Sequence, residues 1–260
     1  MTEPRMLKAM LLTEWRSAFE FAALPIGLPL LTASLPRGDG HTVVVVPGLL
    51  TGDTITQPLR SFLRLQGYDA RGWGLGTNLG LRAGVMEQVH AKLNAICESS
   101  GGPISLIGWS LGGIVAREFA RSHPNAVRQV ISLGSPLYGA PEKATNIWGL
   151  YRLISGRSEV LPHERGDEPP PVRSISIYTR SDGIVAWRSC VEKDGPASEN
   201  IEVRGASHTG LGVNPLVLYA VADRLGQPQD AWQPFSPPRW ARAWFPATTQ
   251  RSFEQIERTP

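Results

Sequence analysis

Gly108-Trp-Ser-Leu-Gly112 carries the clearest chemical signal in this chain of 260 residues, because it fits the pattern G-x-S-x-G. The run joins an apolar segment that predicts a strand to a helical pattern that begins at Leu111. A turn this tight between a strand and a helix strains its central residue and projects that side chain above the sheet. Ser110 is therefore predicted to be a nucleophile at a helix N-terminus, where the helix dipole favours developing negative charge. The alternative is a serine that only caps the helix.

A serine hydroxyl needs a base at neutral pH, and the chain offers five histidines. His208 lies in a loop that follows a predicted strand, which puts it at the carboxyl edge where open parallel sheets bind their ligands. His41 precedes a strand and is expected at the opposite edge. The other three lie inside a helix, at the end of a helix or in a polar insert: His90, His123 and His163. We therefore expect His208 to be the general base.

The acid that orients the histidine is predicted to be Asp182, in the sequence Ser181-Asp-Gly-Ile-Val185. It follows the strand predicted over residues 172–179 and so reaches the same sheet edge. The alternative is an Asp-Gly pair that only forms a turn. Other acidic residues lie in the polar insert or farther along the chain: Asp167, Glu168 and Asp194. The chain order serine, acid, histidine is that of one fold class.

Two backbone N–H groups must stabilise the negative oxygen that forms during acyl transfer. One is expected from Leu111, directly after the nucleophile. The other is expected from Leu49, in the loop 47–53 that follows the apolar run Thr42–Val46. Only an N–H is required there, so the leucine side chain is no obstacle.

The elements that must position these residues alternate from residue 42 onward. The run Thr42–Val46 lacks polar alternation, which suits a strand covered on both faces. We predict strands over 42–46, 68–73, 103–108, 127–133, 172–179 and 200–203, and helices over 58–66, 82–99, 111–122 and 213–225. This order predicts an α/β fold with a mostly parallel sheet and helices on both faces.

Three regions are predicted: an N-terminal extension (1–40), a core (41–226) with an insert at about 138–171, and a C-terminal tail (227–260). The extension contains an apolar stretch, 21–33, which is too short to span a bilayer and is interrupted by Pro25 and Pro29. We expect a helix and a turn docked on the core. The tail is rich in aromatic residues and is expected to pack on the core, the alternative being an oligomer contact or a lipid-facing patch.

The insert has apolar residues at helical spacing between 147 and 154. They predict a cap helix over the acyl pocket, the alternative being a helix that simply packs on the core. Candidate substrate contacts are Leu50, Trp109, Trp148 and Tyr151. Trp109 could equally belong to the core.

Composition argues against several classes of protein and of site. Lys and Arg number 26 against 23 Asp and Glu, and no basic run is present, which argues against a nucleic-acid protein. The two cysteines are far apart, which excludes a cysteine metal site and a disulfide framework, although one bridge stays open. The default location is the cytoplasm, with secretion or membrane association left open.

Several segments of the chain are similar to one known family: Val46-Pro-Gly-Leu49, Gly108-Trp-Ser-Leu-Gly-Gly113, Leu133-Gly-Ser-Pro136, 181–185 and 207–215. Over residues 40–226 the chain resembles the α/β-hydrolases, and within them the bacterial lipase and esterase branch. The resemblance implies hydrolysis of an acyl bond through a serine acyl-enzyme, a helical cap inserted after strand 127–133, and neither metal nor organic cofactor. Pro47 departs from the histidine of many members, and few strands are evident before residue 42.

A carboxylic-ester hydrolase, either esterase or lipase, is the favoured interpretation, with a small or lipid-like neutral ester as substrate. A thioesterase, amidase or acyltransferase would use the same three side chains. A non-catalytic binding protein on the same fold is a third hypothesis, and an intact Ser110, Asp182 and His208 argues against it. Peripheral membrane contact or self-association through the N-terminal apolar segment and the aromatic tail stays open.

Overall fold

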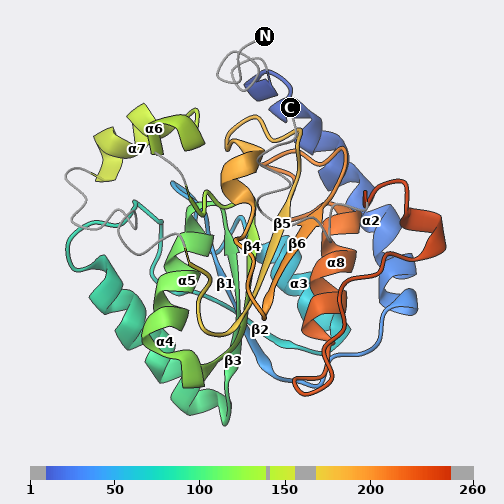
Figure 1. The fold of residues 1–260 in the computed structure, drawn as a ribbon, viewed down its shortest axis with the longest axis horizontal. Coiled ribbons are helices and arrows are strands. Elements are labelled where there is room, and N and C mark those ends of the chain that lie inside the picture. The colour runs from blue at the N-terminus through green and yellow to red at the C-terminus, as the bar shows by residue number, and fades with distance from the viewer. Residues whose placement is uncertain (1–9, 139–140, 156–167, 247–260) are drawn as a thin grey trace.

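The computed structural model describes residues 10–138, 141–155 and 168–246 (Figure 1). Its centre is a six-stranded sheet with the order β2-β1-β3-β4-β5-β6, in which every neighbouring pair is parallel. The strands are β1 (Thr42–Val46), β2 (Asp69–Gly72), β3 (Ile104–Trp109), β4 (Val127–Leu133), β5 (Arg173–Tyr178) and β6 (Ser198–Glu202). The predicted α/β fold with a mostly parallel sheet is confirmed.

Helices cover both faces of the sheet (Figure 1). On one face, Val44 and Val46 pack with α4 (Val85–Ser100) and α5 (Leu111–Ser122). On the other, Val43 and Val45 pack with α2, α3 and α8. The bounds of these three are α2 (Ser17–Ser34), α3 (Gln57–Gln66) and α8 (Pro215–Leu225). All five residues of β1 are therefore buried, which explains its unbroken apolar sequence.

The strand order brings the loops after β1, β3, β4 and β5 to one edge of the sheet. Because β1 has β2 on one side and β3 on the other, the chain changes direction across the sheet between β1 and β3. Open α/β sheets bind ligands at such a switch point, outside the carboxyl ends of the strands. Val46 pairs with Gly108, and Leu133 pairs with both Trp109 and Ile177. The loops after β1, β3, β4 and β5 therefore leave the sheet at the same edge.

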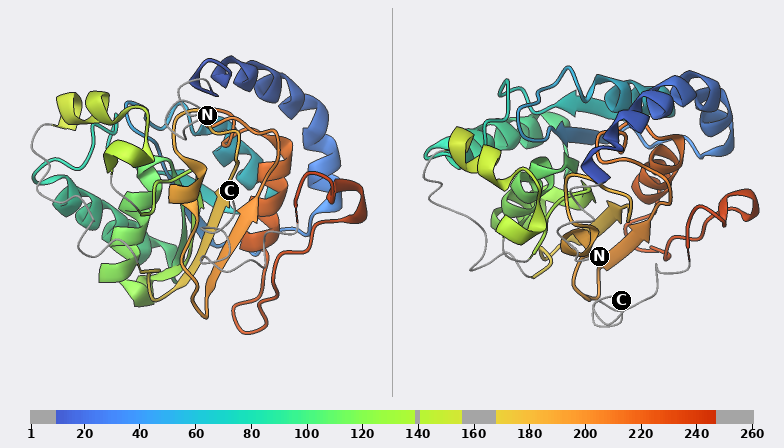
Figure 2. Two further views of the ribbon diagram at one scale, coloured as in Figure 1. Left: turned by 45° about the horizontal axis from the view of Figure 1, so that its top comes forward. Right: turned by 90° about the horizontal axis from the view of Figure 1, so that it is seen from above.

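The N-terminal extension is more regular than its sequence indicates. A short helix, η1 (Glu14–Arg16), leads into α2, which continues through Pro25 and Pro29. An internal proline removes a helical hydrogen bond, so a break was expected. Packing of α2 on α8, with Leu31 buried and Leu28 partly buried, stabilises the continuous helix. Both views of Figure 2 show this blue helix beside the orange loops that follow β5 and β6. Within the described residues, none of the helices has the length and apolar character needed to cross a bilayer.

The insert forms two helices rather than the single one predicted. They are α6 (Pro141–Ala144) and α7 (Trp148–Ser155), and the break between them has a tertiary cause. Thr145 pairs with Val185 in an antiparallel bridge, and the Thr145 hydroxyl donates to Ile184 O at 2.9 Å. Most of the predicted insert beyond α7, residues 156–167, lies outside the described residues.

Part of the tail packs on the core. Phe235 and Phe245 are buried against the same cluster as α2 and α8, near the short helix η4 (Arg239–Ala241). The backbone N–H of Phe235 also donates to the buried Glu199 carboxylate. The two remaining short helices are η2 (Pro124–Ala126) and η3 (Trp187–Cys190), and Cys97 and Cys190 are unpaired thiols.

Candidate active site

Ser110 occupies a strained turn between β3 and α5. Its φ is +54° and its ψ is −122°, a conformation that residues other than glycine rarely adopt. Such backbone strain costs about 1–3 kcal/mol and persists only where the surroundings fix it. Here the Ser110 N–H donates to Leu133 O at 2.8 Å. A Cβ added to Gly112 would lie only 2.3 Å from Val46 O, so the turn needs glycine at that position.

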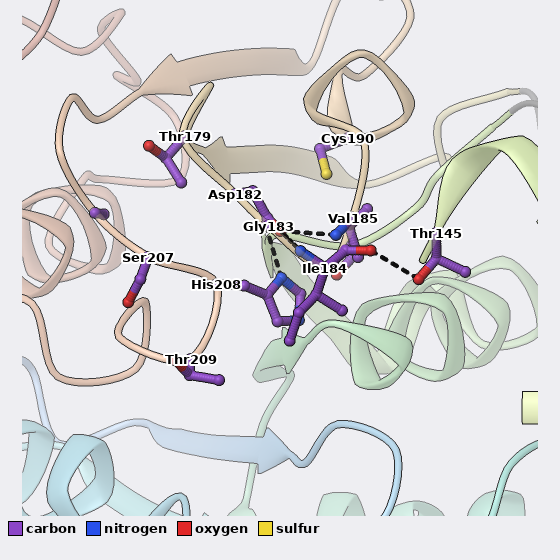
Figure 3. Close-up of polar contacts among 12 residues, drawn as sticks. Thr145, Thr179, Asp182, Gly183, Ile184, Val185, Cys190, Ser207, His208 and Thr209 are labelled. Atoms are coloured by element: carbon purple, nitrogen blue, oxygen red, sulfur yellow. Dashed lines mark hydrogen bonds and ion pairs between the residues drawn. The ribbon is translucent and has the colours of Figure 1, made fainter. Parts of the chain in front are cut away.

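A buried hydrogen bond joins the predicted acid to the predicted base. Asp182 Oδ2 lies 2.7 Å from His208 Nδ1, and both side chains are almost fully buried (Figure 3). The second carboxylate oxygen, Oδ1, accepts from the N–H groups of Ile184 at 2.8 Å and Val185 at 2.7 Å. Each oxygen of Asp182 is thus bonded, which fixes the carboxylate and aims one oxygen at the imidazole.

The electrostatics of His208 are compatible with the role of a base that the sequence predicts for it. Burial alone lowers the pKa of His208, but the adjacent Asp182 charge and its hydrogen bond, together with the charge of Glu14, raise it above its ordinary value. A hydrogen bond to the Asp182 carboxylate keeps the proton of a neutral imidazole on Nδ1. Nε2 is then the nitrogen that can accept a proton from a hydroxyl.

Residues at the carboxyl ends of two adjacent strands, β3 and β4, lie against the Asp182–His208 pair. Trp109, which directly precedes Ser110, donates its indole N–H to His208 O at 3.1 Å. At the end of β4, a Cβ added to Gly134 would lie 3.2 Å from both Asp182 Oδ2 and His208 Nδ1. In the part of the chain that the structure describes, Ser110 Oγ makes no hydrogen bond to His208. The pair therefore lies beside the serine turn, at the edge predicted from the sequence.

Among the described residues, the alternative histidines His41, His90 and His123 are bonded or packed elsewhere. His41 lies at the opposite end of the sheet, where its Nε2 is 2.8 Å from Ser105 Oγ. His90 and His123 form an aromatic cluster with Phe119 of α5. His163 and Asp167 lie outside the described residues.

The loop after β1 lies directly beside the serine. A Cβ added to Gly48 would be 3.3 Å from Ser110 Cβ, so Leu49 follows a backbone that lies against Ser110. As the first residue of α5, Leu111 has an N–H without an intrahelical acceptor. The two backbone donors predicted from the sequence thus flank the serine turn, Leu49 in the loop after β1 and Leu111 at the start of α5.

Asn78 organises this loop and is a residue that the sequence analysis missed. Its side-chain amide donates to Pro47 O at 2.8 Å, and its backbone oxygen accepts from the N–H of Leu50 at 2.7 Å. Leu50 has a φ of +60°, so these bonds hold a second strained residue in place. Asn78 lies in a glycine-rich loop, and no local pattern distinguishes it from an ordinary turn residue.

The candidate substrate contacts occupy different environments. Leu50 is 46% exposed, whereas Trp109 is 6% exposed and belongs to the core. Trp148 and Tyr151 of α7 stack with ring centroids 5.4 Å apart. The Tyr151 ring lies against the loop after β2, because a Cβ added to Gly80 would be 3.1 Å from Tyr151 Cε2.

Two carboxylates of the N-terminal extension also reach the site. Glu14 and Glu20 are both buried and accept hydrogen bonds from the loop that carries His208. Neither residue was among the candidates predicted from the sequence. No spacing or motif marks either residue. Among the described residues, no cluster of three or more His, Cys, Asp or Glu side chains is arranged to hold a metal ion.

The Asp182–His208 bond gives a direct prediction for titration. Asp182→Asn should lower the pKa of His208, because the charge and the charge-assisted hydrogen bond that favour imidazolium are both lost. Long-range ¹H–¹⁵N correlation spectra across pH measure the titration, with His208→Gln assigning the signal. Asp39→Asn is a matched control, since Asp39 contacts His41 and should change the titration of His41 but not that of His208. An unchanged pKa of His208 in Asp182→Asn would contradict the arrangement described.

The chain was compared with protein families and with curated proteins. No family model matches it. Over 111 residues, 41% of this chain and 41% of the relative, it is 33% identical to a pimeloyl-[acyl-carrier protein] methyl ester esterase of Aliivibrio salmonicida. Over 165 residues, 59% of this chain and 66% of the relative, it is 26% identical to a protein of the same name from Aromatoleum aromaticum. The chain thus spans less than two thirds of the length of these relatives.

Solved structures show the fold. Aspergillus fumigatus lipase B matches with a TM-score of 0.52 and 21% identity, over 74% of this chain and 54% of that one. The six-stranded parallel sheet, the strained serine turn after β3, and the acid and histidine loops after β5 and β6 agree with this likeness. The chain is therefore a protein of the α/β-hydrolase fold.

Proposed function

We propose that this chain is a serine hydrolase that cleaves carboxylic esters through an acyl-enzyme intermediate. The observation that carries the proposal is the buried hydrogen bond between Asp182 Oδ2 and His208 Nδ1, at the sheet edge where the strained Ser110 follows β3. A carboxylate that orients an imidazole beside a strained serine turn is the arrangement that activates a serine hydroxyl. The esterase names of the relatives support the same reaction class.

The proposed chemistry begins with proton transfer. Nε2 of His208 takes the proton of Ser110 Oγ while the oxygen attacks the acyl carbon of the ester. Asp182 stabilises the imidazolium that forms. The N–H groups of Leu49 and Leu111 donate to the negative oxygen of the tetrahedral intermediate. The intermediate collapses, the C–O bond to the alcohol breaks, and the alcohol leaves with the proton from His208.

Water completes the cycle by the same route. His208 removes a proton from a water molecule, which attacks the acyl-enzyme at its carbonyl carbon. The second tetrahedral intermediate is stabilised by the same two N–H groups. Its collapse releases the carboxylic acid and returns the proton to Ser110 Oγ. Removal of one such donor typically costs about 3 kcal/mol of transition-state stabilisation.

The substrate is proposed to be a neutral ester with an apolar group. The relatives are named for hydrolysis of a methyl ester, and the sequence has no basic run to bind a polyanionic group. Leu50 beside the nucleophile is 46% exposed, and α7 carries the exposed Leu150 and Leu153. Leu50, Trp148 and Tyr151 are proposed to contact the substrate. Trp109 is better suited to support the histidine loop, since its ring is buried and its N–H is bonded to His208 O.

Covalent labelling tests the nucleophile. A fluorophosphonate should label the folded protein at Ser110, and Ser110→Ala should abolish both labelling and the burst of p-nitrophenol from a p-nitrophenyl ester. Ser122→Ala is a matched control, because that exposed hydroxyl bonds only within α5.

Asp182→Asn should reduce kcat by about 10⁴-fold without unfolding, because the imidazole tautomer is disturbed. Labelling elsewhere, or normal turnover in Asp182→Asn, would refute the assignment.

A chain-length series of esters tests the substrate class. We expect hydrolysis rates to rise with acyl length over short chains, because the contacts offered near the serine are apolar. The measurement is kcat/KM for p-nitrophenyl esters below and above the concentration at which they form micelles. A jump at that concentration would indicate a lipase, and saturation on dissolved short chains an esterase. Preference for the shortest acyl group throughout would contradict an apolar site.

A further inference from the structure

The first described part of the N-terminal extension, residues 10–20, is called the N-terminal segment below. It crosses directly over the loops that carry the acid and the base. A Cβ added to Gly183, the residue after Asp182, would lie 2.5 Å from Met10 C and O. A Cβ added to Gly210, two residues after His208, would lie 2.3 Å from the Glu20 carboxylate. Both loops therefore have glycine where the N-terminal segment approaches most closely. Figure 2 shows the start of this segment beside the same loops.

One carboxylate of this segment bonds both loops. Glu14 Oε1 accepts from the N–H of Gly183 at 2.8 Å, which belongs to the acid loop, and from the N–H of His208 at 3.2 Å. Glu14 Oε2 accepts from the N–H of Thr209 at 3.0 Å and from its hydroxyl at 2.9 Å. Because Glu14 is only 9% exposed, water competes poorly for these bonds. Glu14 thus fixes the separation of the backbones that follow Asp182 and carry His208.

Two further charged side chains reinforce the same contact. Glu20 accepts from the N–H of Ser207 at 2.8 Å and from Asn214 Nδ2 at 2.7 Å. The Arg16 guanidinium donates to Ala206 O at 3.1 Å and to Ser181 O. Three charged residues within seven positions of the chain therefore bind the backbone on either side of the catalytic pair.

The charge state of Glu14 agrees with these contacts. Burial raises the pKa of a carboxyl group, but the N–H groups of Thr209, Gly183 and His208 outweigh burial and lower the pKa of Glu14. The carboxyl is therefore ionised at neutral pH, and its charge contributes to the raised pKa of His208. The other charged groups that face the His208 loop are Asp182, Arg16 and Glu20.

We propose that Glu14 is a positioning residue for catalysis, which holds the acid loop and the histidine loop at the separation that the Asp182–His208 hydrogen bond needs. The N-terminal segment is then part of the catalytic machinery and not an appendage of the core. Glu14 touches neither substrate nor the reacting atoms and acts through the two loops. This inference rests on the proposed function.

Two substitutions separate the hydrogen bonds of Glu14 from its charge. Glu14→Ala removes every acceptor, so we expect kcat to fall by about 10–100-fold, the scale on which small displacements of catalytic groups act, with KM within about twofold. Glu14→Gln keeps one oxygen acceptor and should restore part of the turnover. It also removes a negative charge that favours imidazolium, so the pKa of His208 should fall. At low pH, kcat/KM falls because His208 becomes protonated. This fall, the acid limb of the profile, should therefore move to lower pH in Glu14→Gln.

The matched control is Thr32→Ala, in the same N-terminal extension but near the end of α2, where the exposed hydroxyl bonds only to Pro29 O. It should match the wild type in turnover, labelling and pH profile. The measurements are kcat, KM and the rate of fluorophosphonate labelling of the full-length chain across pH, with circular dichroism to check folding. If Glu14→Ala fails to fold, the pH profile and labelling rate of Glu14→Gln decide the question.

The outcomes distinguish this inference from the function on which it rests. Slower labelling of the Glu14 variants, with the acid limb of Glu14→Gln displaced to lower pH, would support the positioning role. A labelled wild type whose Glu14 variants keep the same labelling rate and the same acid limb would overturn the inference alone. A folded wild type that is not labelled at all would overturn the proposed function and the inference with it.

Discussion

The hydrogen bond between Asp182 Oδ2 and His208 Nδ1, 2.7 Å long and buried, is the interaction on which the rest of the site depends. A buried charge is costly unless it is paired and its remaining lone pairs are bonded. Hydrogen bonds from several segments of the chain meet this requirement. The N–H groups of Ile184 and Val185 bond the second oxygen of Asp182, and Glu14 bonds the N–H of His208. The pair is therefore held from both ends, by segments that are far apart in the sequence.

The parallel sheet brings these segments to one place. Since β1, β3, β4, β5 and β6 all end at the same edge, the loops that follow them begin next to one another. Close contacts then set the finer geometry. The serine turn and the loop of Leu49 touch through Gly48, and the insert before α7 bonds the acid loop through Thr145. The acid loop consequently lies between the insert on one side and the N-terminal segment on the other.

Local patterns in the sequence predicted much of this arrangement. The turn at Ser110 was predictable because its glycines, its strand and its helix are contiguous, and the structure agrees with that turn. The edge argument brought Asp182 and His208 to the correct side of the sheet, since it depends only on each residue following a strand. Their pairing was expected from the roles assigned to them, but the length and burial of the hydrogen bond could not be predicted, because it joins loops whose relative position depends on the whole fold.

What the sequence analysis missed has the same physical origin. Glu14 bonds residues 169 to 195 positions away, and no local pattern distinguishes such a carboxylate from one on the surface. The break between α6 and α7 follows from the pairing of Thr145 with Val185, which is also remote in the sequence. Conversely, α2 continues through Pro25 and Pro29 because its packing on α8 outweighs local helix propensity.

A crystal structure of the protein after reaction with a fluorophosphonate would show whether Ser110, Asp182 and His208 act as one unit. We expect phosphorus bonded to Ser110 Oγ, with the Asp182–His208 hydrogen bond intact and Nε2 of His208 facing the adduct. The phosphoryl oxygen should lie within hydrogen-bond distance of the N–H groups of Leu49 and Leu111. An adduct on another side chain, or one whose phosphoryl oxygen meets neither N–H while His208 points elsewhere, would show that these three side chains do not act together.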